Sequence, residues 1–97
     1  MTVKLMRAPG EPVESATDMG GFVAHCAGSR DWRLLHAIDE VGDTDVFGPW
    51  IDDLLADWDE ARALVRSLED ENCWHKVRAL AVECEADAGL YLQFVGD

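Results

Sequence analysis

The stretch PWIDDLLADWDEARALVRSL, residues 49–68, decides the fold class, because its apolar residues recur with the period of an α-helix. The apolar stripe consists of Ile51, Leu54, Leu55, Trp58, Ala61, Val65 and Leu68. Most of the acidic side chains in this stretch lie opposite the stripe, and Pro49 suits the first helical turn, where a missing N–H removes no hydrogen bond. The pattern therefore predicts an amphipathic helix that buries one face.

A second helix is predicted directly after the first. Either Ser67 or Asp70 could cap its N-terminus, and Gly89 is predicted to end it. Its apolar face consists of Cys73, Val77, Leu80, Ala81, Cys84 and Ala88. A weaker stripe on its other side consists of His75, Ala79, Val82 and Ala86. This stripe indicates either that the helix is covered on both sides or that it meets a second copy of the chain, so a homodimer is one hypothesis.

Short runs of alternating apolar residues surround the two helices and predict β-strands. The predicted strands are Thr2–Met6, Phe22–Cys26, Trp32–Ile38 and Leu90–Val95, and residues 39–48 are predicted to be a loop. Strands, two helices and a final strand favour an α+β domain, with the two helices on one face of a small, mostly antiparallel three- to four-stranded sheet. A length of 97 residues predicts a single domain, residues 1–97.

The negative charge of the chain is concentrated in its middle. Twenty acidic and eight basic side chains give a net charge of −12, and residues 39–71 contain twelve of the acidic and two of the basic ones. Nucleic-acid phosphates and anionic membranes would repel such a protein, so we expect neither as a partner. The expected partner is a basic protein. The alternative is a solvated helix face that keeps a small protein in solution.

Trp50 lies within this acidic region. An aromatic side chain with a charged rim is typical of an interface anchor, and packing in the core is the alternative. The residues predicted to bind a partner are Asp39, Asp43, Asp45, Trp50, Asp52, Asp53 and Asp57. The predicted function is a non-enzymatic interaction module of the immunity-protein or antitoxin kind, which binds a basic partner through the carboxylates of residues 39–60. A small homodimeric structural or regulatory protein is an alternative.

A small-molecule binder or an enzyme is a further alternative, based on Cys26 and His36. No catalytic motif surrounds these two residues, so no catalytic residue and no cofactor are predicted. A calcium loop would begin at Asp43, but its twelfth position is Leu54 instead of the bidentate acid that such a loop requires. No metal site is therefore predicted.

Features of the whole chain predict a cytoplasmic location. No run of apolar residues is long enough to span a membrane, and the N-terminal residues lack the apolar core of a signal peptide. The three cysteines, Cys26, Cys73 and Cys84, show no spacing typical of a disulfide framework or a metal site. We expect them to be reduced and mostly buried.

Two segments carry a resemblance to known proteins: AIDEVGDTDVF at residues 37–47 and LYLQFVGD at residues 90–97. With the helices between them, they resemble small, uncharacterised acidic proteins of actinobacteria, which contain an I-D-x-x-G-D-T segment and end in Y-L-x-F-x-G-D. The resemblance covers residues 32–97, and Asp45 is an additional residue relative to the pattern. It implies a self-contained folded domain and carries no activity or functional residue.

Overall fold

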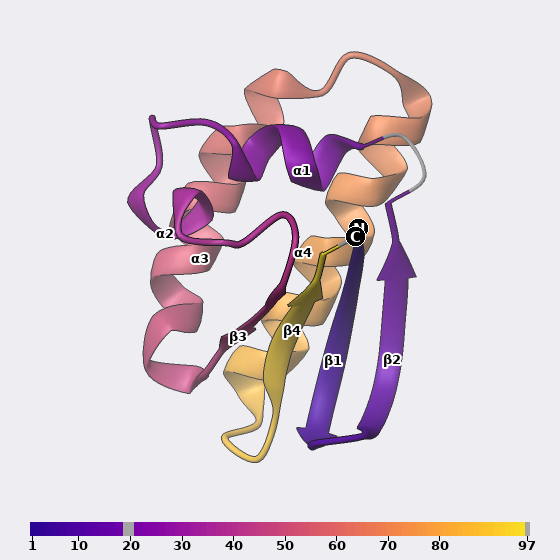
Figure 1. The fold of residues 1–97 in the computed structure, drawn as a ribbon, viewed down its shortest axis with the longest axis vertical. Helices are drawn as coiled ribbons and strands as arrows, with labels where there is room; N and C mark the ends of the chain where they lie inside the picture. Colours follow the sequence, from indigo (N-terminus) through magenta and orange to yellow (C-terminus); the bar gives the residue numbers. More distant parts are fainter. Residues whose placement is uncertain (19–20, 97) are drawn as a thin grey trace.

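The computed structural model describes residues 1–18 and 21–96. Four strands among them form one antiparallel sheet with the order β2-β1-β4-β3 (Figure 1). The strands are β1 (Thr2–Ala8), β2 (Glu11–Thr17), β3 (Asp43–Val46) and β4 (Tyr91–Val95). Together with the helices, this sheet confirms the predicted α+β class.

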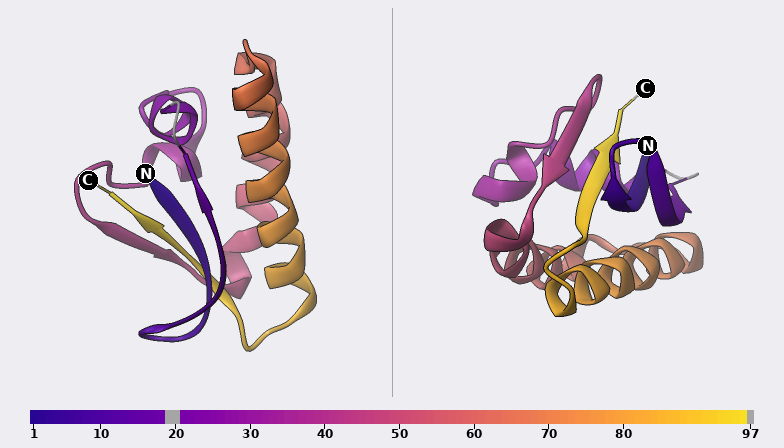
Figure 2. Two further views of the ribbon diagram at one scale, coloured as in Figure 1. Left: turned by 90° about the vertical axis from the view of Figure 1, so that its right-hand side faces the viewer. Right: turned by 90° about the horizontal axis from the view of Figure 1, so that it is seen from below.

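The helices form a layer beside the sheet. They are α1 (Phe22–Ala27), α2 (Arg33–His36), α3 (Gly48–Ala61), the 3₁₀ turn η1 (Arg62–Leu64) and α4 (Leu68–Ala86). Helix α4 packs against β1, β2 and β4, whereas α3 packs mainly against α4 and α2. Figure 2 shows α3 and α4 side by side, with α1 and α2 at the end where the sheet diverges from them.

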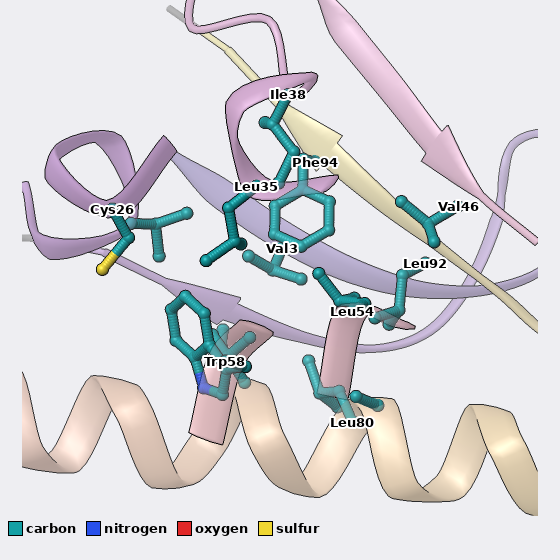
Figure 3. Close-up of a cluster of buried hydrophobic side chains, with 14 of the residues drawn as sticks. Val3, Cys26, Leu35, Ile38, Val46, Leu54, Trp58, Leu80, Leu92 and Phe94 are labelled. Atoms are coloured by element: carbon teal, nitrogen blue, oxygen red, sulfur yellow. The ribbon is translucent and has the colours of Figure 1, made fainter. Parts of the chain in front are cut away.

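The core lies between the sheet and the helices (Figure 3). Val3 and Leu5 of β1 and Leu92 and Phe94 of β4 are fully buried, as the predicted alternation of these strands requires. Trp58 of α3 closes the core from the helical side. Burial of one such side chain stabilises the fold by roughly 1.5–3 kcal/mol.

Two tryptophans join α3 to α4 by reciprocal hydrogen bonds. The indole Nε1 of Trp58 donates to the carbonyl oxygen of Trp74 at 3.0 Å, and Nε1 of Trp74 donates to the carbonyl oxygen of Trp58 at 2.7 Å. Both side chains are buried, so each indole N–H would otherwise lack a partner. This pair of bonds fixes how far the two helices are displaced along each other.

The strand predicted at 22–26 is wrong, because this segment forms α1. Its buried residues, Phe22, Val23, Cys26 and Ala27, follow one side of a helix. The carboxylate of Asp18 accepts hydrogen bonds from the backbone N–H groups of Phe22, at 2.9 Å, and Val23, at 2.6 Å. These bonds satisfy two donors at the helix start that no helical carbonyl can reach.

The strand predicted at 32–38 is also wrong, because Arg33–His36 form the short helix α2. Here the carboxylate comes from α3: Oδ2 of Asp57 accepts from the backbone N–H groups of Leu34, at 3.1 Å, and Leu35, at 3.3 Å. The apolar pattern of so short a run fits the period of a strand as well as that of a helix. The hydrogen bonds to the distant Asp57 carboxylate stabilise the helix.

Strands β2 and β3 were not predicted. β2 is exposed except at Ala16, so it lacks an alternating apolar signal, and Gly10, with a φ of 80°, makes the turn that leads into it. β3 lies within the predicted loop 39–48. Its Thr44 and Val46 are partly or fully buried, whereas Asp43 and Asp45 are exposed, so the alternation is present but consists largely of polar residues.

The ends of the two long helices differ in part from the prediction. The side chain of Ser67 accepts a hydrogen bond from the N–H of Asp70 at 3.0 Å, which confirms Ser67 as the cap of α4. Helix α3 ends at Ala61 instead of reaching Leu68. Gly89 is not the C-terminal cap of α4, because the helix ends at Ala86 with Asp87 as its C-cap, and the N–H of Gly89 donates to the Asp87 carboxylate.

The three cysteines are free thiols and are buried, as predicted. Among residues 1–18 and 21–96, no helix combines the length and apolar character that crossing a membrane requires.

Candidate functional site

Trp50 lies at the surface in the first turn of α3, with 58% of its area exposed. Packing in the core, the alternative considered for this residue, is therefore wrong. An exposed tryptophan leaves a large apolar surface in contact with water, which is unfavourable unless another surface covers it. Trp50 is consequently the starting point for a candidate binding site.

Two adjoining cavities of about 260 and 270 Å³ flank Trp50. They share Leu34, Ala37 and Trp50, so they adjoin each other, and we call the two together the Trp50 groove. The groove is lined by Arg33, Leu34, Ala37, Ile38, Thr44, Asp45, Val46, Trp50, Asp53, Ala56 and Asp57. It lies between α2, α3 and β3, and its lining is mainly apolar.

Three of the predicted acidic residues lie on this groove. Asp53 is exposed, and Oδ1 of Asp45 accepts a hydrogen bond from Nε2 of Gln93 at 3.1 Å. Asp57 is partly buried, and its bonds to the backbone of α2 give it a structural role. Arg33 is the basic side chain on the groove, so the lining contains three carboxylates and one guanidinium.

The other predicted acidic residues lie outside the groove. Asp43 is two residues before Asp45 on β3 and points to the same side of the strand. Asp39 lies in the preceding turn, where backbone hydrogen bonds from Val41 and Gly42 lower the pKa of its carboxyl. The seven predicted residues therefore do not form a single cluster.

Asp52 belongs to a different surface from its neighbour Asp53. A side-chain hydrogen bond with Asp52, followed by the negative charge of Asp52, raises the pKa of Glu85 on α4. Nearby, Nε of Arg78 lies 2.7 Å from the Asp59 carboxylate, and the guanidinium of Arg62 lies 3.2 Å from the Glu71 carboxylate. The acidic surface across α3 and α4 is thus partly neutralised by the chain's own arginines.

Sequence reasoning missed the wall of the groove that α2 provides. In the predicted strand Trp32–Ile38, Leu34 and Ala37 would point to opposite faces, whereas on a helix residues three apart lie on the same side. The spacing of these two apolar residues was the available signal. The segment is too short for this spacing to distinguish a helix from a strand.

Cys26 and His36 do not form an activated nucleophile. Cys26 is fully buried, and burial, followed by the charge of Asp18, raises the pKa of its thiol to about 12. A thiol with such a pKa is protonated at neutral pH and is a weak nucleophile. His36 is exposed at the end of α2. Within the part of the chain that the structure describes, no group of three potential ligands is placed to hold a metal ion.

The weaker stripe of α4 is at the surface. His75, Ala79, Val82 and Ala86 are all exposed, and Val82 exposes 43% of its area. No part of the described chain covers this side of the helix, so the stripe is available to a second copy or to another protein.

Comparison with known protein families, with curated proteins and with solved structures finds no match to the chain. The resemblance to acidic actinobacterial proteins therefore stays a prediction, and functional arguments depend on the geometry of the site.

Proposed function

We propose that this protein is a non-enzymatic interaction module that binds a basic protein partner through the Trp50 groove. The observation that carries the proposal is the exposed Trp50 beside an apolar groove whose rim contains Asp45 and Asp53. In many protein interfaces, most of the binding energy comes from an aromatic side chain that becomes buried on binding and is surrounded by polar contacts. The immunity-protein or antitoxin kind of module is the class that this arrangement fits.

Charge complementarity supports a basic partner. Asp53 lines one of the two cavities that Trp50 borders, and Asp45 lines the other. Lysine or arginine side chains of the partner would pair with them while an apolar side chain enters the groove. The net charge of −12 would accelerate the encounter with a cationic protein. We expect the protein to act in the cytoplasm, where its three free thiols stay reduced.

Neighbouring aspartates provide a matched test of this proposal. Asp53→Lys changes the groove, whereas Asp52→Lys makes the same charge change on the surface shared with α4. Immobilised wild-type protein, both variants and Trp50→Ala are used to capture proteins from a lysate of the producing cells. A basic protein that is retained by the wild type and Asp52→Lys but lost from Trp50→Ala and Asp53→Lys supports the proposal. Equal retention by all four proteins contradicts it.

A homodimer through α4 is a second candidate, favoured by the exposed Val82 and its neighbours Ala79 and Ala86. The partner surface would then be the stripe that includes His75. Sedimentation equilibrium at micromolar concentration tests this candidate, and Val82→Glu should dissociate such a dimer. A wild-type protein that sediments as a monomer rules the dimer out under those conditions.

A further inference from the structure

We propose that the partner binds as an extended segment that adds a strand to the free edge of β3. Its lysine or arginine side chains would lie opposite Asp43 and Asp45, and the apolar side chains between them would enter the Trp50 groove. This inference rests on the proposed function and adds the conformation and sequence pattern of the partner.

The register of the sheet determines which backbone groups are available at this edge. β3 is the last strand in the order, and Asp43 is paired with Val95, so Gly42 lies opposite Gly96. The N–H of Gly96 donates to the carbonyl oxygen of Gly42 at 2.9 Å, which makes this a hydrogen-bonded pair. Such pairs alternate along an antiparallel ladder. The N–H and C=O groups of Asp43 and Asp45 therefore point away from β4.

One cavity of the Trp50 groove runs along the same edge. Three consecutive residues of β3, Thr44, Asp45 and Val46, line it. Successive side chains point to opposite faces of a sheet, so contact with all three residues favours a cavity that lies along the edge of the strand. Trp50 and Ala37, which lie outside the strand, also line this cavity. An extended segment placed here would have hydrogen-bonding groups on one side and an apolar surface on the other.

The other edge of the sheet lacks these properties. β2 contains Pro12, which has no N–H, and its pairing with β1 has two register shifts. Proline and irregular pairing are common means of preventing an edge strand from recruiting another strand. β3 contains no proline, and its pairing with β4 is regular.

The charges on β3 select a basic segment over a second copy of the chain. Asp43 and Asp45 project from the same face of the strand. Antiparallel pairing of two β3 strands would place these carboxylates opposite each other, and like charges in cross-strand pairs are destabilising. Lysine or arginine side chains at the same positions of a partner strand would be attracted to the carboxylates of Asp43 and Asp45. The expected partner segment therefore alternates basic and apolar residues.

A pair of synthetic peptides tests the proposal with the full chain. The first is an acetylated, amidated hexapeptide of alternating lysine and valine, and the second is the same peptide methylated on the backbone nitrogen of each lysine. Both have the same charge, but the second cannot donate to β3. We expect the first to bind about tenfold more tightly or better, which corresponds to 1.4 kcal/mol. The amide hydrogens of Asp43 and Asp45 should exchange more slowly in its complex.

Variants of the two edges provide the controls. Asp45→Lys and Trp50→Ala should weaken binding of the unmethylated peptide, and Glu14→Lys on β2 should retain it. Equal affinity of the two peptides, absence of protection at Asp43 and Asp45, or failure of the unmethylated peptide to bind would each overturn strand addition. If both peptides bind equally and Asp53→Lys weakens both, the proposed function stands and only the strand geometry fails.

Discussion

Gly96 shows how closely the chain is packed at the end of the sheet. A Cβ atom at this position would lie 2.6 Å from the carbonyl oxygens of both Glu40 and Gly42, and neither backbone can move without disturbing β3. We expect Gly96→Ala to lower the free energy of unfolding by about 1–3 kcal/mol. Urea denaturation measures the loss. Gly89→Ala is the control, because only the side chains of Asp87 and Arg7 are near it, and equal midpoints for the two variants would contradict the prediction.

Asp18 is a buried carboxylate that holds the start of α1. It accepts from the N–H groups of Phe22 and Val23 and from the thiol of Cys73, and it is 6% exposed. Replacing it with alanine leaves buried donors without an acceptor. Asp18→Ala should therefore cost about 1–3 kcal/mol of stability. Thermal denaturation followed by circular dichroism measures the loss. Asp31→Ala is the control, because Asp31 is exposed and its replacement should change stability little.

The buried thiols predict a loss of stability at alkaline pH. Burial, followed by the charge of Asp18, raises the pKa of Cys26 and of Cys73 from 9.0 to about 12. In the unfolded chain the thiols lose their protons at lower pH, so above pH 9 the unfolded state is increasingly favoured. The contribution of the thiols is complete below pH 9 and disappears as pH rises toward 12.

The double variant Cys26→Ala, Cys73→Ala separates the effect of the two thiols from the other effects of alkaline pH. Its midpoint of urea denaturation should fall less steeply between pH 8 and pH 11 than that of the wild type. Parallel curves for the two proteins would show that the thiols do not control the alkaline transition.

At the scale of elements, the reciprocal tryptophan bonds make the α3–α4 pair dependent on two indole N–H groups. Trp74→Phe keeps most of the apolar volume but removes the donor to the Trp58 carbonyl. We expect a loss of about 1–3 kcal/mol in urea denaturation. Trp50→Phe is the matched control, because Trp50 is exposed and should change stability little. A similar midpoint for both variants would refute the structural role of the bond.

The elements that the sequence predicts correctly are those with long or regular patterns. Five of the seven apolar positions of the predicted stripe, Ile51 to Ala61, lie in α3, and they and the alternation of β4 identify these elements without tertiary information. Helices α1 and α2 are six and four residues long, and their starts are stabilised by Asp18 and Asp57. Asp57 is more than twenty residues away along the chain from the residues that it caps, and a local pattern contains no such information.

The candidate site is predicted in part for the same reason. Trp50, Asp45 and Asp53 follow from composition and charge, because an aromatic residue among acids is visible in the sequence. The wall provided by Leu34 and Ala37 depends on the position of α2 and could not be predicted. Asp52 was grouped with Asp53, although a helix turns by about 100° between successive residues and directs it toward Glu85.

For the whole molecule, the net charge of −12 predicts that salt increases stability. Repulsion among the carboxylates favours the expanded chain, and dissolved ions screen it. The midpoint of thermal unfolding should therefore rise as sodium chloride is added from low ionic strength. Asp52→Lys should raise the midpoint at low salt, because it replaces a carboxylate beside Glu85 with a cation. A midpoint that falls with salt would contradict this account.

The hydrogen bonds that the Asp57 carboxylate accepts from the backbone of α2 have a consequence for recognition. They hold α2 against α3 before any ligand binds, so the wall of the Trp50 groove that α2 provides is preorganised. In the proposed complex, this protein would lose little conformational entropy on association. Most of the entropy loss would come from ordering the partner's extended segment. In the proposed complex, substitution of an exposed rim residue such as Asp53 would therefore change specificity for the partner without changing the helices beneath it.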